Sequence, residues 1–243
     1  MKIQAFVNHK GGVGKTTLSY NYAHHRGKQG KKVLFLDLDP QMAASFLFNS
    51  WDDKAFVGRI FKGDPVEAAP VAQNVSLLNA GTKLRLLEIK DRFFSRPVMF
   101  GDRLRQYLAS VADKYDECVI DTPPIIDGMM ETIISVSDYC IIPLQSEILP
   151  IVGLESINTI IDNVKGSKYF IVINMFAPRT RLQNQILDEL RENYHSIVLP
   201  TPIRRSIRVV DAQHRKVPIS SIKCGVAQDF AKVFKELDAR LVK

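Results

Sequence analysis

Residues 3–17 read IQAFVNHKGGVGKTT, a short apolar run that leads directly into a glycine-rich loop. The run IQAFVN (3–8) predicts a buried strand, and a helical pattern follows from about Thr16 to Gln29. In such a loop, backbone N–H groups can converge on phosphate, and the N-terminus of the helix adds the positive end of its dipole. The stretch therefore predicts a phosphate-binding loop between a strand and a helix.

Further apolar runs continue the alternation of strands and helices along the chain. Strands are predicted at 32–39, 75–80, 117–124, 139–145, 169–176 and 196–203, and helices at about 41–48, 98–113, 151–164, 180–193 and 226–241. Residues 50–98 are the least periodic part and predict loops, a short helix and the minor strand at 75–80. Strands rich in Ile and Val without polar alternation are typical of a parallel sheet that is covered on both faces. We expect a single α/β domain over residues 1–243, with a doubly wound, mostly parallel sheet of the P-loop NTPase type.

The composition is that of an ordinary globular protein, with 46% apolar and 24% charged residues. No apolar run has the length that crosses a bilayer, and the N-terminus lacks the features of a signal peptide. The three cysteines are far apart and lack metal-ligand spacing, which indicates small buried thiols. An iron–sulfur protein would need cysteines that pair or bridge two subunits.

The net charge of +7 is concentrated in one segment. Residues 165–223 contain eleven Lys and Arg against four Asp and Glu, whereas the remainder holds 22 of each sign. A localised basic excess is typical of a surface that binds a polyanion, although a charge cluster is more often only a solvated face.

Candidate catalytic groups gather at the predicted strand ends. Lys15 is expected to bridge the β- and γ-phosphates of a nucleotide, and the Thr16 hydroxyl to bind Mg²⁺. Asp37 and Asp39 stand at and just beyond the end of one strand, and Asp121 ends another. These ends meet at one edge of a parallel sheet, where aspartates can hold Mg²⁺ through its waters and orient an attacking water. A lone aspartate there is often a helix cap, but three beside a phosphate loop favour catalysis.

The chain resembles the ParA/Soj partition ATPases, within the deviant Walker group that includes MinD. The matching segments are KGGVGKTT (10–17) for the deviant Walker A motif, LDLDPQ (36–41) for the A′ motif and YDECVIDTPP (115–124) for the Walker B segment. Three later segments are also similar to the family: IIPLQSEILPIVGL (141–154), INMFAPRT (173–180) and TPIRRSIRVVDAQHRKVPI (201–219). The resemblance covers nearly the whole chain.

The resemblance implies an ATPase that uses ATP and Mg²⁺ and has weak basal activity. Lys10 is the signature lysine, which in the family reaches into the nucleotide site of a second copy of the chain. Asp39 would position the hydrolytic water. Thr16, Asp37 and Asp121 are the implied metal-binding residues, with Asp37 in a supporting role. The implied ATP-binding residues are Lys10, Gly11, Gly12, Val13, Gly14, Lys15, Thr16 and Thr17, with Asn174 at the adenine.

The resemblance also implies partners. Family members bind DNA without sequence preference as ATP dimers, and a ParB-type centromere-binding protein stimulates hydrolysis and releases them. Arg179 and Arg208 match DNA-contacting positions, and Arg204 and Arg205 would enlarge the patch. A protein of this kind is cytoplasmic and nucleoid-associated and segregates a plasmid or chromosome.

Two features depart from the longer or commoner family pattern. The first strand begins almost at residue 2, so neither an N-terminal helix-turn-helix nor operator binding is expected. TPIRRSIR (201–208) replaces the commoner Ile-Pro-Arg-Asn sequence, and INMF (173–176) stands where Thr-Met-Tyr is frequent.

Three other functions are compatible with the same fold. A MinD-like positioning ATPase would end in a detachable amphipathic helix, whereas residues 226–243 carry mixed charges typical of a packed helix. A metabolic ligase would need neither Lys10 nor a basic segment. An interaction module that uses nucleotide only as a dimerisation switch would show almost no ATPase activity.

Overall fold

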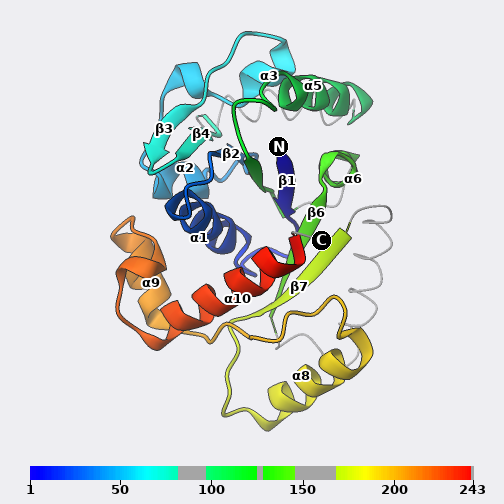
Figure 1. The fold of residues 1–243 in the computed structure, drawn as a ribbon, viewed down its shortest axis with the longest axis vertical. Coiled ribbons are helices and arrows are strands. Elements are labelled where there is room, and N and C mark those ends of the chain that lie inside the picture. Colours follow the sequence, from blue (N-terminus) through cyan, green and yellow to red (C-terminus); the bar gives the residue numbers. More distant parts are fainter. Residues whose placement is uncertain (82–96, 125–127, 146–167, 242–243) are drawn as a thin grey trace.

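The computed structural model describes residues 1–81, 97–124, 128–145 and 168–241. Within these ranges the chain forms a seven-stranded sheet in the order β3-β4-β2-β5-β1-β6-β7 (Figure 1). The strands are β1 (Lys2–Phe6), β2 (Val33–Asp37), β3 (Ala69–Ala72), β4 (Val75–Leu78), β5 (Glu117–Asp121), β6 (Tyr139–Gln145) and β7 (Lys168–Asn174). All pairings are parallel except β3 with β4. The expected α/β fold with a mostly parallel sheet is confirmed.

Helices cover both faces of the sheet. They are α1 (Lys15–Lys28), α2 (Ala43–Leu47), α3 (Gly58–Lys62), α5 (Pro97–Ser110), α6 (Gly128–Val136), α8 (Arg181–Tyr194), α9 (Ile207–His214) and α10 (Gly225–Leu241), with short 3₁₀ turns η1 (Asp53–Ala55) and η3 (Ile219–Ser221). One core cluster joins α3, α5, α6 and α8 to the sheet, and the other joins α1, α2, α9 and α10 to it. None of the helices in the described ranges is both long enough and apolar enough to span a bilayer.

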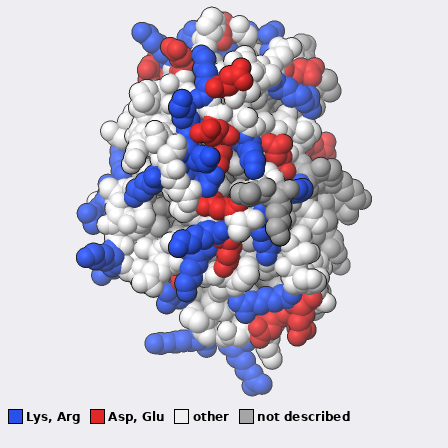
Figure 2. All heavy atoms as spheres, viewed as in Figure 1, with Lys and Arg blue, Asp and Glu red and all other residues white. Residues whose placement is uncertain are grey.

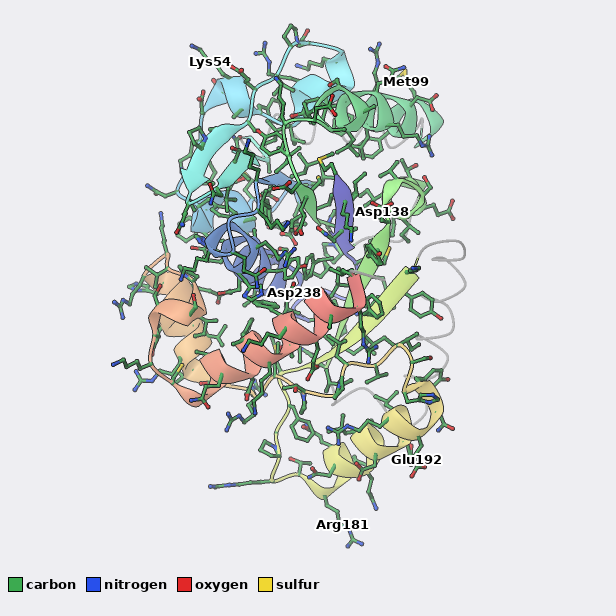
Figure 3. All side chains as sticks on the ribbon, in the orientation of Figure 1. Lys54, Met99, Asp138, Arg181, Glu192 and Asp238 are labelled. Carbon is green, nitrogen blue, oxygen red and sulfur yellow. The ribbon has the colours of Figure 1, made fainter. Side chains whose placement is uncertain are left out.

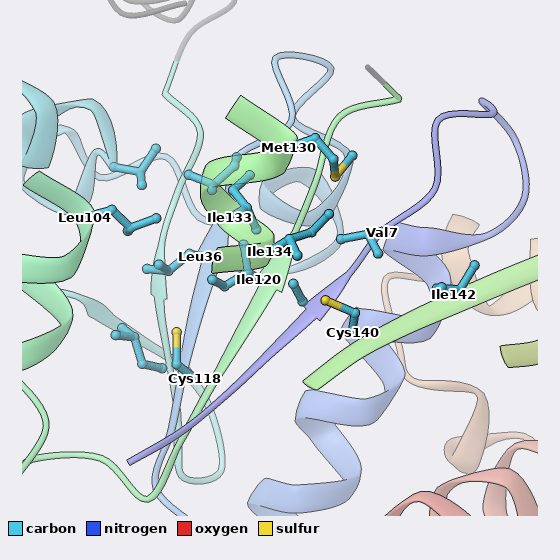
Figure 4. Packing of buried hydrophobic residues seen from close by; sticks show 14 of the residues in the cluster. Val7, Leu36, Leu104, Cys118, Ile120, Met130, Ile133, Ile134, Cys140 and Ile142 are labelled. Carbon is cyan, nitrogen blue, oxygen red and sulfur yellow. The ribbon is translucent and has the colours of Figure 1, made fainter. Parts of the chain in front are cut away.

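The central strands have apolar residues on both faces because both are covered. β2 and β5 are buried at every position. On one face, Leu104 of α5 and Ile133 of α6 join the cluster that contains Leu36 of β2 and Ile120 of β5 (Figure 4). A strand buried on both sides cannot alternate apolar and polar residues, and the sequence shows this continuous pattern.

Strand register brings the predicted acids to one edge of the sheet. Phe6, the last residue of β1, is level with Asp121 of β5, and Asp121 is level with Asp37 of β2. The phosphate loop leaves β1 at this same level. The two aspartates therefore end neighbouring strands beside the loop, as the sequence predicts.

One predicted strand is wrong. Residues 196–203 form no strand: Val198 makes an isolated bridge to Ile171, and Arg204, just beyond the segment, makes another to Phe176. Pro200 and Pro202 explain the difference, because a proline lacks the N–H that a continuous ladder requires.

The sequence also missed or left open several elements. Helices α6 and α9 and strand β3 are present without having been predicted. The short helix expected between 50 and 98 is α3. The helix predicted at 151–164, and the part of the 141–154 motif beyond Gln145, lie outside the described residues.

Candidate nucleotide site

The loop between β1 and α1 has a backbone that only glycine adopts easily. Gly12 and Gly14 have φ values of 76° and 99°, in the left-handed region. Gly14 is also the residue that immediately precedes α1, and no side chain in the described ranges caps this end of the helix. The first turn of α1 contains no acidic residue. The unsatisfied N–H groups of the helix are therefore available to an anion.

Two side-chain amides hold the loop against the end of β6. Asn8 donates to the carbonyl oxygen of Pro143 at 2.8 Å and accepts from the backbone N–H of Lys10 at 2.9 Å. Gln145 donates to the carbonyl of Gly12 at 2.9 Å. The shape of the loop is thus fixed by contacts with β6 as well as by its glycines.

Asn174, at the end of β7, is a further contact with the loop. Its Nδ2 donates to the carbonyl oxygen of Val13 at 2.8 Å, and the residue is 5% exposed. The resemblance predicts an adenine contact for Asn174, and that role stays a prediction.

The two lysines of the loop lie in different surroundings. Lys15 is 6% exposed, and its Nζ donates to the carbonyl oxygen of Lys10 at 3.2 Å. Burial lowers the pKa of Lys15, and the charges of Asp121 and Asp39 partly offset that effect. The side chain of Lys10 is exposed at the entrance to the loop. Lys15 is therefore directed into the site and Lys10 is accessible from outside the molecule.

Asp121 is a fully buried carboxylate without a hydrogen bond of ordinary geometry to either oxygen among the described residues. Its pKa is raised well above the usual value, first by burial and then by the charge of Asp37. The hydroxyl of Thr16 acts in the opposite direction and lowers the pKa of Asp121. A buried acid with unused oxygens beside a hydroxyl is suited to hold a cation.

The described residues contain no cluster of three or more His, Cys, Asp or Glu side chains that could hold a metal unaided. Mg²⁺ does not require one, since it is usually held by one or two protein ligands together with waters and substrate phosphates. Thr16 and Asp121 therefore fit a magnesium ion that arrives with a nucleotide.

Asp37 uses its oxygens inside the protein. One accepts from the backbone N–H of Asp39 at 3.2 Å, and the other from the backbone N–H and hydroxyl of Ser45 at 2.8 and 2.6 Å. Burial raises the pKa of Asp37 to about 6, although these hydrogen bonds act in the opposite direction. Because Ser45 lies in α2, Asp37 anchors that helix to the edge of the sheet. Its expected part in metal binding stays a prediction.

Asp39 lies in the turn between β2 and α2 and is 7% exposed. Its Oδ1 accepts from the backbone N–H of Gln41 at 2.8 Å. Burial raises its pKa, whereas the hydrogen bond from Gln41 and the charge of Lys15 lower it. A partly desolvated carboxylate within the field of Lys15 can accept a hydrogen bond from water.

Helix α9 is attached to the phosphate-loop helix by polar contacts. Gln213 of α9 donates to the hydroxyl of Thr17 at 2.9 Å. Beyond α9, the backbone N–H of Ile219 donates to Oδ1 of Asn21 at 2.7 Å. Sequence reasoning missed both Gln213 and Gln145. Gln145 could have been found because it ends a predicted strand, but no pattern marks Gln213.

In the described part of the chain, two cavities adjoin the start of α1. One, of about 420 Å³, lies beside Thr17, Asn174 and Met175 and is bounded by the segment around Ile203. The other, of about 660 Å³, lies beside Thr16 and is lined mainly by apolar side chains that include Phe46 and Trp51. The first has Thr17, Asn174 and Gln213 among its lining residues and lies in the position that a nucleoside attached to loop-bound phosphates would need.

The predicted DNA-contacting arginines lie on and around α9 and on the loop before α8. Arg179 is exposed on that loop, and Figure 2 shows Lys and Arg side chains scattered over the same side of the molecule as α9. Arg208 makes an exposed ion pair with Asp211 at 3.3 Å. Arg205 is exposed as well. Arg204 differs, because its guanidinium binds Asp229 through two hydrogen bonds of 2.7 and 2.9 Å.

The P-loop NTPases are the class of α/β protein in which a phosphate loop follows a central strand of a parallel sheet, and this chain is one of them. Residues 1–175 match the family model described as an AAA domain. The chain is 28% identical to the chromosome-partitioning ATPase Soj of Treponema pallidum, over 98% of both chains. It is 31% identical to the sporulation initiation inhibitor protein Soj of Bacillus subtilis, over 90% of both. The chain belongs to the ParA/Soj family of ATPases.

The fold is also similar to solved structures. A putative plasmid partition protein from Borrelia burgdorferi, solved with bound AMPPNP, aligns over 98% of this chain and 99% of its own with a TM-score of 0.83. The identity is 21%, so this likeness concerns the fold.

Proposed function

We propose that the protein is a DNA-partition ATPase that dimerises with ATP, binds DNA non-specifically in that form and is released after hydrolysis. The observation that carries the proposal is the different placement of the two loop lysines. Lys15 is buried and directed into its own site, whereas Lys10 is exposed at the loop entrance. A second lysine that does not serve its own nucleotide is suited to reach a phosphate held by another copy.

Phosphate binding would use groups that are already in position. The backbone N–H groups of residues 11–17 and the N-terminus of α1 would surround the β- and γ-phosphates, and Lys15 would bridge them. Thr16 and Asp121 would hold Mg²⁺, which when bound neutralises phosphate charge. The cavity beside Thr17 would accept the nucleoside, with Asn174 at its edge.

Hydrolysis would depend on Asp39. Its burial raises its pKa, and this favours acceptance of a hydrogen bond from the attacking water. Asp37 would support this geometry because it holds α2 and accepts from the N–H of Asp39. Slow basal turnover is expected, since the site would be completed only by a second copy and by a stimulating partner.

DNA binding would use exposed arginines, and a dimer would present two sets of them. Arg179, Arg205 and Arg208 are exposed, and Arg204 would contribute less because two hydrogen bonds of 2.7 and 2.9 Å hold its guanidinium on Asp229. Contacts with phosphate give little sequence preference, and two linked patches bind more tightly than one. A ParB-type protein would stimulate hydrolysis, and the protein would be cytoplasmic and nucleoid-associated. The Soj relative from Treponema pallidum bears the name of a chromosome-partitioning ATPase, which supports this role.

A MinD-like positioning ATPase is the second candidate. It would require α10 to detach, but seven residues of that helix are buried, including Phe230, Phe234 and Leu237. Arg240 also donates to the carbonyl of Ser196 at 2.8 Å. The packing of α10 therefore favours the partition function.

The test is the oligomeric state with ATP, ADP or no nucleotide, measured by sedimentation velocity. We expect ATP with Mg²⁺ to produce a dimer in the wild type. Lys10→Ala should remain a monomer while still binding ATP, because Lys15 serves the nucleotide of its own subunit. Lys31→Ala, which removes another exposed lysine, is the control and should dimerise normally. A Lys10→Ala variant that dimerises as well as the wild type would exclude the proposed role of Lys10.

A further inference from the structure

Two side-chain amides bind successive carbonyl groups of the phosphate loop. Nε2 of Gln145 donates to the carbonyl oxygen of Gly12 at 2.9 Å, and Nδ2 of Asn174 donates to that of Val13 at 2.8 Å. Gln145 and Asn174 are the last residues of β6 and β7 and are paired in the strand register. Register partners in parallel strands project to the same side of the sheet, so the two amides form one pair.

The loop needs such partners because of the way it binds phosphate. Its N–H groups must point toward the anion, so its carbonyl groups point away from it. A carbonyl turned away from the ligand and toward the protein has to be hydrogen-bonded there. The amides of Gln145 and Asn174 satisfy this requirement at Gly12 and Val13.

Gly14 is shaped for the approach of Asn174. A Cβ atom at Gly14 would lie 2.2 Å from Nδ2 of Asn174, which is far closer than two such atoms can come. Gly14 also has a φ of 99°, which disfavours any other residue. The glycine therefore allows both the left-handed turn and the close contact with the amide.

The neighbouring residue supports the same arrangement. Met175 has a φ of 53°, unusual for a side chain of its size, and its sulfur accepts from Nε2 of Gln145 at 3.0 Å. The amide of Gln145 thus contacts both the loop and the residue that follows Asn174.

We infer that Gln145 and Asn174 are positioning residues that hold the phosphate loop in its binding conformation before a nucleotide binds. The inference rests on the proposed function in one respect, namely that the loop binds the phosphates of a nucleotide. According to this inference, Asn174 acts on the triphosphate end of the nucleotide, because it holds the carbonyl of Val13 in the phosphate loop. Gln145 becomes a further residue of the site. The role expected from the resemblance, recognition of adenine, concerns the opposite end.

The experiment compares ATP with inorganic tripolyphosphate, which has no base or ribose, in the presence of Mg²⁺. Binding is measured by calorimetry for the wild type, Asn174→Ala and Gln145→Ala. Each variant loses one hydrogen bond to the loop, so we expect affinity for both ligands to fall roughly fivefold to tenfold. Asn174→Asp keeps the shape but replaces the donor with a negative charge, so binding of both ligands should fall further than in Asn174→Ala. Asn184→Ala is the matched control, because its amide binds the carbonyls of Pro178 and Thr180 on another loop.

Hydrogen exchange of the nucleotide-free protein gives a second readout. Amides of residues 10–15 should exchange faster in Asn174→Ala and in Gln145→Ala than in the wild type, while those of α10 remain unchanged. If Asn174→Ala does not fold, Gln145→Ala alone decides, since Gln145 is only half-buried.

The outcomes separate this inference from the proposed function. If Asn174→Ala no longer binds ATP but binds tripolyphosphate with the wild-type affinity and shows normal hydrogen exchange, Asn174 contacts the base and the inference is wrong. Unchanged binding of both ligands and unchanged exchange in both variants would also overturn it. If the wild type binds neither ligand, the nucleotide-binding function itself fails and the inference falls with it.

Discussion

Asp121 shows at the scale of one residue how a functional group can oppose the stability of the free protein. The carboxylate is fully buried, lacks an ordinary hydrogen bond within the described residues and lies near the charges of Asp37 and Asp39. Unpaired buried charge is destabilising, and the surrounding acids add repulsion. A cation at this position, as proposed for Mg²⁺, would relieve the repulsion during the working cycle.

We expect Asp121→Asn to stabilise the nucleotide-free protein by about 2 kcal/mol at neutral pH, since it removes the charge and nearly keeps the shape. The pKa of Asp121 in the folded protein is raised above its usual value of 3.8, so folding takes up protons and wild-type stability falls as the pH rises from about 4. Asparagine does not titrate. The difference between variant and wild type should therefore be small near pH 4 and grow toward pH 7 in urea unfolding.

The control for this prediction is Asp113→Asn, which changes an exposed acid on the connection between α5 and β5. It should leave stability nearly unchanged at every pH. The same Asp121→Asn protein should lose the extra stability that Mg²⁺ adds to the ATP complex. A variant less stable than the wild type at pH 7 would contradict our account of Asp121.

At this scale the sequence predicted the charged groups better than the amides. Lys15, Asp37 and Asp121 could be placed because motif and strand end coincide, and the structure brings them to one edge of the sheet. The sequence marked Gln145 only as the end of a predicted strand, and it did not mark Gln213 at all. A single polar residue at a strand end or on a helix has no pattern of its own, and only the fold shows which carbonyl or hydroxyl it meets.

At the scale of elements, an ion-pair network joins three segments that are distant in the sequence. Arg26 at the end of α1 binds Glu117 at the start of β5 through both carboxylate oxygens, and Asp238 of α10 at 3.0 Å. His25 contacts the same Asp238 at 2.9 Å. The side chains of Arg26 and Glu117 are only 14% and 6% exposed, so water screens their charges weakly.

Loss of one partner from this network should leave a buried charge without full compensation. We expect Glu117→Gln to lower the free energy of unfolding by about 3 kcal/mol. The matched control is Asp102→Asn. Asp102 forms an ion pair with Arg105, and the side chains of the two residues are 60% and 51% exposed. This variant should change the free energy of unfolding by less than about 1 kcal/mol. Equal, small losses in both variants during chemical unfolding would show that the network has little structural importance.

Predictability differed between elements for physical reasons. The central strands were predictable because burial on both faces leaves a continuous apolar run, as in β2 and β5. Helix α9 was not, because only Ala212 of its eight residues is buried and no apolar stripe results. It is held instead by the cap from Ser206 and by the hydrogen bond from Gln213 to Thr17.

At the scale of the whole molecule, α9 connects the exposed arginines proposed to bind DNA with the helix that follows the phosphate loop. The helix carries Arg208 and contacts Thr17 through Gln213. Helix α8 and the loop before it form a separate projection at one end of the molecule, where Arg181 points outward (Figure 3). Cations on α9 and on this loop would together give the proposed dimer a broad basic surface.

We expect the double variant Arg179→Glu and Arg208→Glu to lose ATP-dependent retention on duplex DNA while it still dimerises with ATP. For the wild type, affinity should fall steeply with salt because binding releases counterions. In milder Ala substitutions at the same two positions, the slope of log affinity against log salt should decrease by about one per lost phosphate contact. Filter binding at several salt concentrations measures both effects.

The control exchanges the same charges elsewhere. Arg103→Glu and Arg105→Glu lie on α5, at the opposite end of the molecule from α8 (Figure 1), and should leave DNA binding intact. If both double variants lose DNA equally, total charge rather than this surface controls binding. That result would remove Arg179 and Arg208 from the proposed contact.

The prolines at the two borders of the sheet have a consequence for aggregation. Pro70 lies in the border strand β3, and Pro200 and Pro202 lie in the segment that runs beside β7. An open strand border offers a row of hydrogen-bonding groups onto which a foreign strand could add, and a proline interrupts that row. A protein that we propose to meet copies of itself repeatedly is thereby protected from joining them edge to edge. Self-association then occurs only through surfaces that ATP binding brings together and hydrolysis separates, so it can remain reversible.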